Sequence, residues 1–350
     1  MIDQSPIVVL AQGVPAWNRW RRVTPSDTVH GPVSKTADRP NLREALLIRA
    51  RLAEINLSYV DGCMINLAGA DLRRASLREA IFYTANLAQA QMTEANLLGA
   101  DLREANLKAA DLSRTQGKLA TFSMADLQGA NLREAILTQS NFCEASLGQV
   151  DACMADLLGC DLSYSDLRNS TLYTANLYRA SLKRANLGNA DLREVNASQA
   201  NFQEAELRET DLSMAILNLA NFVGASLHKA KLKLVNLSLA NLCMASLSHA
   251  NLQRAMMLGV NAIGANFYRA QMQSCNLSEA DCRETILSEA ALRQANLSGA
   301  DFSRANLSGA DLRGANLRGA DLRQANLWDV LVDEHTQLEG AKLPDSFRLS

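Results

Sequence analysis

Residues 41–55 read NLREALLIRARLAEI, and residues 311–327 read DLRGANLRGADLRQANL. Between these stretches, almost every fifth residue is Leu, Phe or Met. The residue two places before it is mostly Ala, and the residue directly before it is mostly Asp or Asn. The register continues without insertion or deletion for about fifty-eight units, so internal repetition decides the fold.

A period of five fits neither of the regular secondary structures. In a helix, five residues turn by about 500°, so the apolar residues would spread around the whole circumference. In a continuous strand the side chains alternate, so an odd period sends successive leucines to opposite faces. The chain must therefore turn once per unit, with short straight pieces that keep every apolar residue inside.

The phenylalanines indicate how many units complete one coil. Six of them occupy the central apolar position at separations that are multiples of twenty, and only Phe267 breaks the rule. We therefore expect four units per coil and a broken stack of rings along one wall. Gly62 and Cys282 should make room for neighbouring rings on that wall. The six residues are Phe82, Phe122, Phe142, Phe202, Phe222 and Phe302.

Units such as ADLRE, ANLRE, ANLSG and ADLRG resemble the A(D/N)LXX motif of the pentapeptide-repeat family. The resemblance covers roughly four-fifths of the chain and is specific, because dozens of units agree. It implies an all-β solenoid, a right-handed quadrilateral β-helix of about 14 coils stacked at about 4.8 Å. It also implies that the central residue and the Ala two places before it face inward.

Two segments flank the repeat, so we expect three parts in the chain. Residues 1–39 are predicted to form a short N-terminal helical cap and a linker. Residues 40–330 form the β-helix, and residues 331–350 form a C-terminal cap or tail. Ends of this kind in the family either close the coil or form a homodimer.

The N-terminal segment carries two tryptophans next to basic residues. Ser5-Pro6 favours a helix start, and Gly13 favours a break. Trp17 and Trp20 are three apart, so they share a helix face that could cover the open first coil. Arg21, with its basic neighbours, suggests the alternative of a docking arm for a partner. The lead-in WNRWR also resembles one found in cyanobacterial members of the family.

Composition and motifs bound the function. The net charge is −2, and no two of the seven cysteines stack on adjacent coils, which favours a reducing compartment. No stretch approaches the ~20 apolar residues of a membrane span. No secretory signal is expected, because the first apolar run is short and lacks a basic flank, so we expect a cytoplasmic protein. No P-loop, dinucleotide fingerprint, GxSxG or HExxH occurs. We therefore expect no catalytic residue, no cofactor and no enzyme activity.

Two clusters resemble metal sites but are interpreted otherwise. Asp151, Asp156, Asp161 and Asp166 fall on different sides of a twenty-residue coil, so the four cannot converge on one ion. They are better explained as turn residues that bond to nearby backbone. His228 and His249 fall on neighbouring coils, but a zinc site needs more ligands than two. No metal is therefore expected.

One wall of the expected coil is unusually apolar. Contiguous exposed apolar area often marks an interaction site, although scattered exposed leucines are common. We therefore predict a surface for a partner protein or for self-association on this wall. Its outward residues are Leu158, Tyr178, Ile216, Leu219, Leu234, Leu239, Met256 and Leu258.

These observations favour a non-catalytic protein-interaction scaffold. The family resemblance narrows this predicted function to regulation of the kind found in cyanobacterial cell differentiation, including heterocyst formation. The alternative is a DNA mimic that binds DNA gyrase or topoisomerase, but such members are strongly acidic and this chain is nearly neutral. Direct nucleic-acid binding is not expected either, because no basic stripe with aromatic residues appears.

Overall fold

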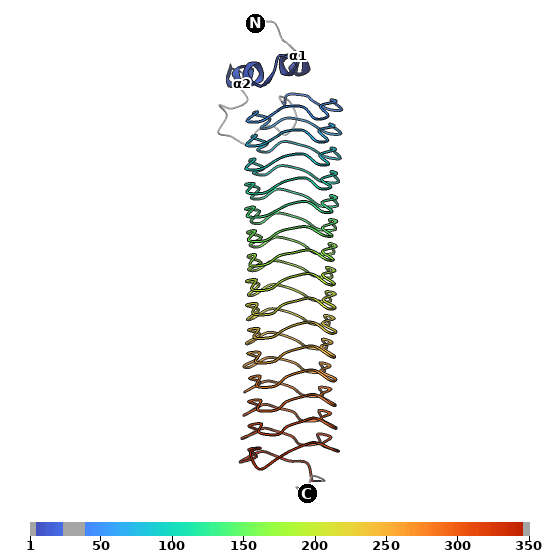
Figure 1. The fold of residues 1–350 in the computed structure, drawn as a ribbon, viewed down its shortest axis with the longest axis vertical. Coiled ribbons are helices and arrows are strands. Elements are labelled where there is room, and N and C mark those ends of the chain that lie inside the picture. Colours follow the sequence, from blue (N-terminus) through green and yellow to red (C-terminus); the bar gives the residue numbers. More distant parts are fainter. Residues whose placement is uncertain (1–4, 24–38, 346–350) are drawn as a thin grey trace. The chain divides into compact units, whose positions relative to one another are not determined.

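The computed structural model describes residues 5–23 and 39–345, in two compact units, residues 1–166 and residues 167–350 (Figure 1). Two helices come first, α1 (Pro6–Leu10) and α2 (Val14–Val23). Ser5 precedes α1, and Gly13 separates the helices with a φ of 94°, as the sequence predicted. No helix in the described part of the chain has the length and apolar character that a membrane crossing needs.

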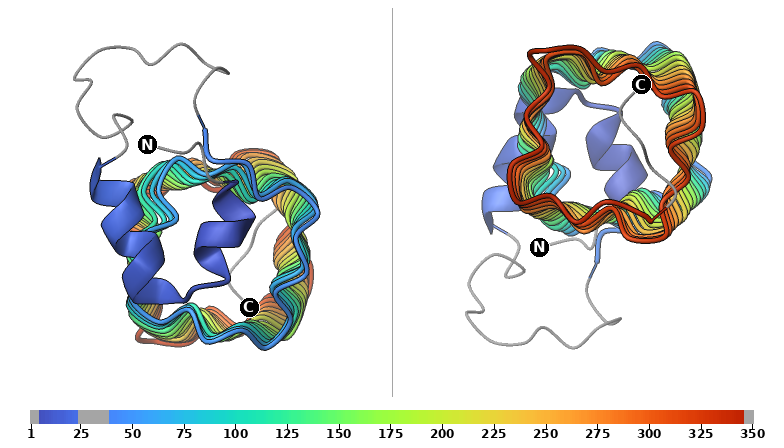
Figure 2. Two further views of the ribbon diagram at one scale, coloured as in Figure 1. Left: turned by 90° about the horizontal axis from the view of Figure 1, so that it is seen from above. Right: turned by 90° about the horizontal axis from the view of Figure 1, so that it is seen from below.

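Residues twenty apart pair in parallel along both units. In the first unit the bridges begin between Asn41 and Asp61, and in the second the spacing is repeated from Thr171 and Asp191. One residue of each pentapeptide is bridged, and no longer strand occurs among the described residues. Each unit has four sides when it is viewed along its coils (Figure 2). The predicted four-sided β-helix with a twenty-residue coil is therefore confirmed.

Each corner is a tight turn built from the same contacts. The Ala45 N–H donates to the Leu42 carbonyl at 3.2 Å, and Glu44 between them has a φ of 60°. This positive φ matches the third residue of a type II turn. The Asn41 side chain accepts a hydrogen bond from the Arg43 N–H at 2.9 Å. Asp or Asn before the central residue thus holds the turn, as the sequence predicted.

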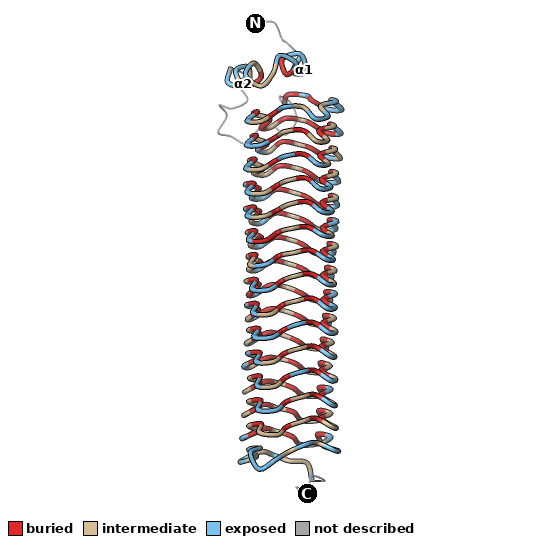
Figure 3. The backbone as a smooth tube through the Cα atoms, in the orientation of Figure 1, coloured by how far each residue is buried: buried red, intermediate tan, exposed pale blue. Residues whose placement is uncertain are grey.

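The positive φ recurs at the same place in nearly every unit, although most of these residues are not glycine. A residue with a Cβ adopts this conformation at a cost of roughly 1 kcal/mol or more. Packing inside the coil and hydrogen bonds between coils must outweigh that cost. The pattern of burial along every coil shows where this packing occurs, because buried and solvent-facing residues alternate in short steps (Figure 3).

The interior is filled by the central residues and the alanines. Phe122 and Phe142 stack with their ring centroids 4.7 Å apart, and Phe202 and Phe222 stack at 4.6 Å. Both distances match the spacing between neighbouring strands, so the rings stack because the coils do. The predicted stack of rings along one wall is therefore confirmed.

Helix α2 contacts the first coil through side chains. Trp17 is fully buried, and its Nε1–H donates to the Asn56 carbonyl at 2.6 Å. Asn18 accepts a hydrogen bond from the Asn56 N–H at 2.8 Å. Arg21 is also fully buried and donates to the Ser58 carbonyl at 2.7 Å.

These contacts replace a missing coil. One coil later, the equivalent groups pair with backbone instead, since the Leu57 N–H donates to the Ser76 carbonyl and the Ser76 N–H donates to the Ile55 carbonyl. The helix therefore satisfies backbone groups that would otherwise lie open at the first coil.

One detail of the docking-arm alternative is wrong. Arg21 does not contribute to an exposed basic face, because its guanidinium is needed at the Ser58 carbonyl and is buried there. Trp20 is half-buried, and its ring centroid lies 5.1 Å from that of Trp17. The predicted linker lies outside the described residues except for Arg39, which donates to the Glu79 carbonyl at 2.6 Å.

The chain after the regular repeat still pairs with the coil before it. Leu331 bridges Asp311 twenty residues earlier, but Gln337 bridges Asn316 and thus lies one residue out of register. Asp333 accommodates the extra residue, since its carboxylate accepts a hydrogen bond from the Gly314 N–H at 2.8 Å. The tail therefore adds an irregular coil as far as Lys342, where the sequence pattern suggested a departure from the repeat.

Gly62 should be intolerant of a side chain. A Cβ on Gly62 would lie 2.7 Å from Cε1 of Phe82, so Gly62→Ala is expected to cost about 1–3 kcal/mol of unfolding free energy through overpacking. Phe82→Leu should relieve the contact. The double variant should therefore lose less unfolding free energy than the two single variants lose in total. Denaturant unfolding of the four proteins measures this coupling, and simple additivity would contradict it.

Trp17 should protect the first coil. Trp17→Ala removes a buried ring and the donor to Asn56, which should weaken the docking of α2 by about 3–5 kcal/mol. Hydrogen exchange should then speed up at first-coil amides such as Leu57, and stay unchanged at Phe122 in the same unit. Arg22→Ala, at an exposed position on α2, serves as the control and should exchange like the wild type.

Candidate protein-binding surface

Depressions on the outer walls are open and are lined mostly by charged side chains, several of which pair with one another. One of 740 Å³ is bordered by Arg193, Lys229 and Lys231. Arg193 pairs with Asp191 at 2.7 Å, and Lys231 approaches Asp211 at 3.5 Å. Such a site lacks the apolar lining that small-molecule sites usually have.

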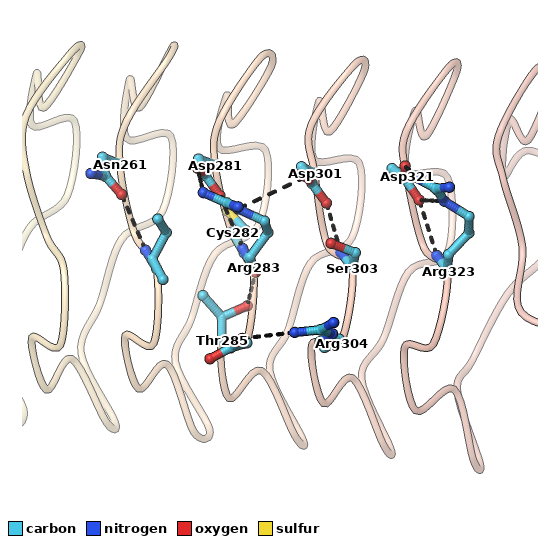
Figure 4. Close-up of polar contacts among 12 residues, drawn as sticks. Asn261, Asp281, Cys282, Arg283, Thr285, Asp301, Ser303, Arg304, Asp321 and Arg323 are labelled. Carbon is cyan, nitrogen blue, oxygen red and sulfur yellow. Dashed lines mark hydrogen bonds and ion pairs between the residues drawn. The ribbon is translucent and has the colours of Figure 1, made fainter.

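Another wall of the second unit carries a column of carboxylates neutralised by arginines (Figure 4). Arg283 forms two hydrogen bonds of 2.8 Å with Asp281, and its Nε lies 4.0 Å from Asp301. Arg323 holds Asp321 in the same way. The hydrogen bonds from Arg283 lower the pKa of Asp281. These exposed pairs keep the wall soluble and in register, and they leave little net charge for a partner.

The predicted apolar surface is exposed in the second unit. Six of its residues there, all except Tyr178, have exposed fractions between 40% for Leu258 and 59% for Leu239. Met214, 47% exposed, lies twenty residues before Leu234 in the same corner column and was missed by the sequence analysis. The repeat register itself could have found it. We call these seven residues the apolar patch: Met214, Ile216, Leu219, Leu234, Leu239, Met256 and Leu258.

The apolar patch is continuous across neighbouring coils. Ile216 and Met256 both bridge Asn236, one from each side. The Leu239 N–H donates to the Leu258 carbonyl at 2.9 Å, which brings these two residues together. Leu239 also leans over the next coil, where its Cδ2 lies 3.0 Å from the Cβ position of Gly259. Exposed apolar side chains therefore recur on neighbouring coils of one wall and its corners, with Asn236 between Ile216 and Met256.

Two residues of the predicted surface are less accessible. Leu158 belongs to the first unit and is half-buried. Tyr178 belongs to the second unit, is half-buried, and lies under the Arg179 guanidinium at 5.1 Å from its ring centroid. The wall that follows the patch along the chain adds Val223, Cys243 and Ile263, all half-buried and stacked at twenty-residue intervals.

Family comparison agrees with the coil geometry. A family model described as Pentapeptide repeats (8 copies) matches overlapping segments that together span residues 65–172 and 175–329. The chain belongs to the pentapeptide repeat family. The right-handed quadrilateral β-helix is the fold of that family, and the twenty-residue bridges and four sides of each unit agree with it.

Solved structures of other pentapeptide repeat proteins are similar to parts of this one. HetL, involved in heterocyst differentiation regulation in the cyanobacterium Nostoc sp., is 28% identical; the match covers 75% of this chain and 92% of HetL, with a TM-score of 0.32. QnrB1, a plasmid-mediated fluoroquinolone resistance protein, is 22% identical over 60% of this chain and 90% of QnrB1, with a TM-score of 0.34. Rfr23 from the cyanobacterium Cyanothece is 23% identical over 41% of this chain and 90% of Rfr23, with a TM-score of 0.20. Comparison with curated proteins found no match.

The polar clusters of this pentapeptide repeat protein serve local structure. Asp151, Asp156 and Asp161 each accept a hydrogen bond from the backbone amide two residues later. His228 hydrogen-bonds Ser248 at 2.8 Å, and its ring centroid lies 5.5 Å from that of His249. Burial and nearby cations lower the pKa of His228. Among the residues that the structure describes, no group of His, Cys, Asp or Glu could hold a metal ion.

Thiol reactivity should divide the seven free cysteines. Burial raises the pKa of Cys160 and Cys275 to about 12, so both stay protonated and shielded at pH 8. Cys143 and Cys243 are half-buried at the surface and should react first with a thiol reagent such as DTNB. Cys243→Ser should remove one fast equivalent, whereas Cys275→Ser should change only the total released after denaturation. Immediate reaction of all seven thiols in the native protein would contradict this division.

Proposed function

We propose that this pentapeptide repeat protein is a non-catalytic scaffold that binds another protein through the apolar patch. The observation that carries the proposal is the continuity of exposed Leu, Ile and Met side chains over neighbouring coils. A contiguous apolar surface of this kind is uncommon on a soluble protein unless a partner covers it.

The chemistry of the patch suits a protein partner. Its centre is uncharged, and methionine side chains such as Met214 and Met256 adapt to irregular partner surfaces. Charged residues are depleted at the centres of protein interfaces, as they are here. The regular hydrogen bonding between coils also holds the patch rigidly, which lowers the entropy cost of binding.

The alternative of a DNA mimic is less well supported. A mimic requires extended acidic faces, whereas the carboxylates of the Asp281 column are held by arginines and the whole chain has a net charge of −2. The resemblance to cyanobacterial members adds a narrower proposal: the partner is a protein that regulates cell differentiation, and the two proteins bind in the cytoplasm. The identity of the captured partner tests that narrower proposal.

Capture experiments with matched variants test the scaffold. Asn is common at the repeat position of Ile216 and Met256, and Gln occurs at the corner position of Leu239, so Ile216→Asn/Leu239→Gln/Met256→Asn should fold normally. A control triple, Leu119→Gln/Ile136→Asn/Ile286→Asn, changes equivalent exposed positions elsewhere. Extracts of the source cells are passed over each immobilised protein, and bound proteins are identified by mass spectrometry.

We expect a partner that is recovered by the wild type and by the control triple, but not by the patch triple. With that partner purified, the patch triple should bind at least about tenfold more weakly, because apolar anchors dominate interface energy. Light scattering of each protein alone checks whether self-association changes instead. Equal binding by all three proteins would show that the patch is not the binding surface.

A further inference from the structure

The apolar patch lies in a part of the chain without acidic residues. The stretch from Leu212 to Ser278 contains no Asp or Glu, although the whole chain has 37 among 350 residues. It contains five basic residues: Lys229, Lys231, Lys233, Arg254 and Arg269. More than three consecutive coils of the second unit therefore carry cations and apolar residues but no carboxylate. Acidic residues return on both sides, at Asp211 and at Glu279.

Three of these cations have no ion-pair partner among residues 5–23 and 39–345, which the structure describes. Lys231 approaches Asp211 at 3.5 Å, and Arg269 pairs with Glu289 at 2.7 Å. Within residues 39–345, which the structure describes, no carboxylate pairs with the exposed side chains of Lys229, Lys233 or Arg254. Elsewhere in the unit the arginine one place after the central residue is held by its own Asp, as in Asp191-Leu-Arg193. At the equivalent place here the chain reads Lys231-Leu-Lys233, so the usual acid is replaced by a second base.

Two of these cations, Lys233 and Arg254, border the apolar patch. The Met214 N–H donates to the Lys233 carbonyl at 2.9 Å, so Lys233 lies beside the edge of the patch. The Leu234 N–H donates to the Gln253 carbonyl at 3.0 Å, which places Arg254 next to Leu234 in the following coil. Lys229 lies at the preceding corner of the coil, in the depression that Glu209 also borders, so it is not part of this edge. The patch thus has a cationic rim on one side, formed by Lys233 and Arg254.

We propose that the partner protein presents an apolar contact surface bordered by Asp or Glu residues, which pair with this cationic rim. This inference rests on the proposed function, since the rim guides a partner that the apolar patch anchors. Charges at the edge of an interface speed association and exclude wrong partners more than they add affinity. Unpaired cations beside an apolar surface supply that selectivity for an acidic partner.

A second copy of the chain fits this surface poorly. In an antiparallel two-fold dimer the cationic rims would meet each other, whereas in a parallel one each rim would face the opposite edge of the partner's patch. Neither arrangement places a carboxylate opposite the rim, because residues 212–278 of both copies contain no Asp or Glu. A different, acidic protein is therefore the better occupant.

A displayed library of random peptides of about 16 residues provides a probe of unbiased chemistry. The library is selected on the full-length protein and counter-selected on Ile216→Asn/Met256→Asn, which removes apolar groups without adding charge. Selected peptides are synthesised, and their affinity is measured by fluorescence anisotropy at low and at high salt. The rim variant is Lys233→Gln/Arg254→Gln. Its matched control is Arg51→Gln/Lys118→Gln, which removes two exposed cations from the first unit.

We expect peptides rich in both apolar and acidic residues. The rim variant should bind them about tenfold more weakly at low salt and with a flatter salt dependence, whereas the matched control should behave like the wild type. Peptides that need Ile216 and Met256 but bind the rim variant normally would contradict the proposal of an acidic partner and would still agree with the proposed scaffold function. If no selected peptide binds the wild type better than the counter-selection variant, the proposed scaffold function is itself contradicted. If phosphatidylserine vesicles or duplex DNA bind more tightly than the peptides and depend on the rim, the partner is a lipid or a nucleic acid instead of an acidic protein.

Discussion

The structure depends on hydrogen bonds that join each residue to its equivalent one coil away. Leu57 and Ser76 show the arrangement, since an amide of one coil donates to a carbonyl of the next at 2.7 Å. Each coil must therefore contain the same number of residues as its neighbour, and the interior must be filled by side chains that stack on themselves. Leu, Phe and Ala meet this requirement, and a residue with positive φ closes each corner even though it is seldom glycine.

The ends of such a structure need separate solutions, because the first and last coils lack a neighbour. At the start, helix α2 supplies side chains in place of a backbone. Trp17, Asn18 and Arg21 bond to groups of Asn56 and Ser58 that a preceding coil would otherwise pair. At the end, the chain adds a coil with one extra residue, and the Asp333 carboxylate takes the place of a backbone carbonyl. Stability in a repeat protein is shared between neighbours, so these ends limit fraying.

The same register sorts the outer surface into columns of residues twenty apart. A substitution repeated at an interval of twenty becomes a stripe, as the neutralised Asp281, Asp301 and Asp321 column shows. The apolar patch and its cationic rim arise in the same way, from changes at outward positions that leave the interior pattern intact. The proposed binding function therefore depends on outward residues that the repeat pattern of the fold does not require.

The sequence by itself determined the twenty-residue coil, the inward positions and the stacked phenylalanines, because a strict period leaves few ways to bury every leucine. It also indicated most of the apolar patch, since each outward position follows from the register once the coil length is known. Only the tertiary structure decided which exposed groups have partners. Arg21 looked like a surface charge but is buried against Ser58, and Tyr178 is half-buried beside Arg179. Such outcomes depend on side-chain directions and on contacts between distant segments, which a one-dimensional repeat pattern does not specify.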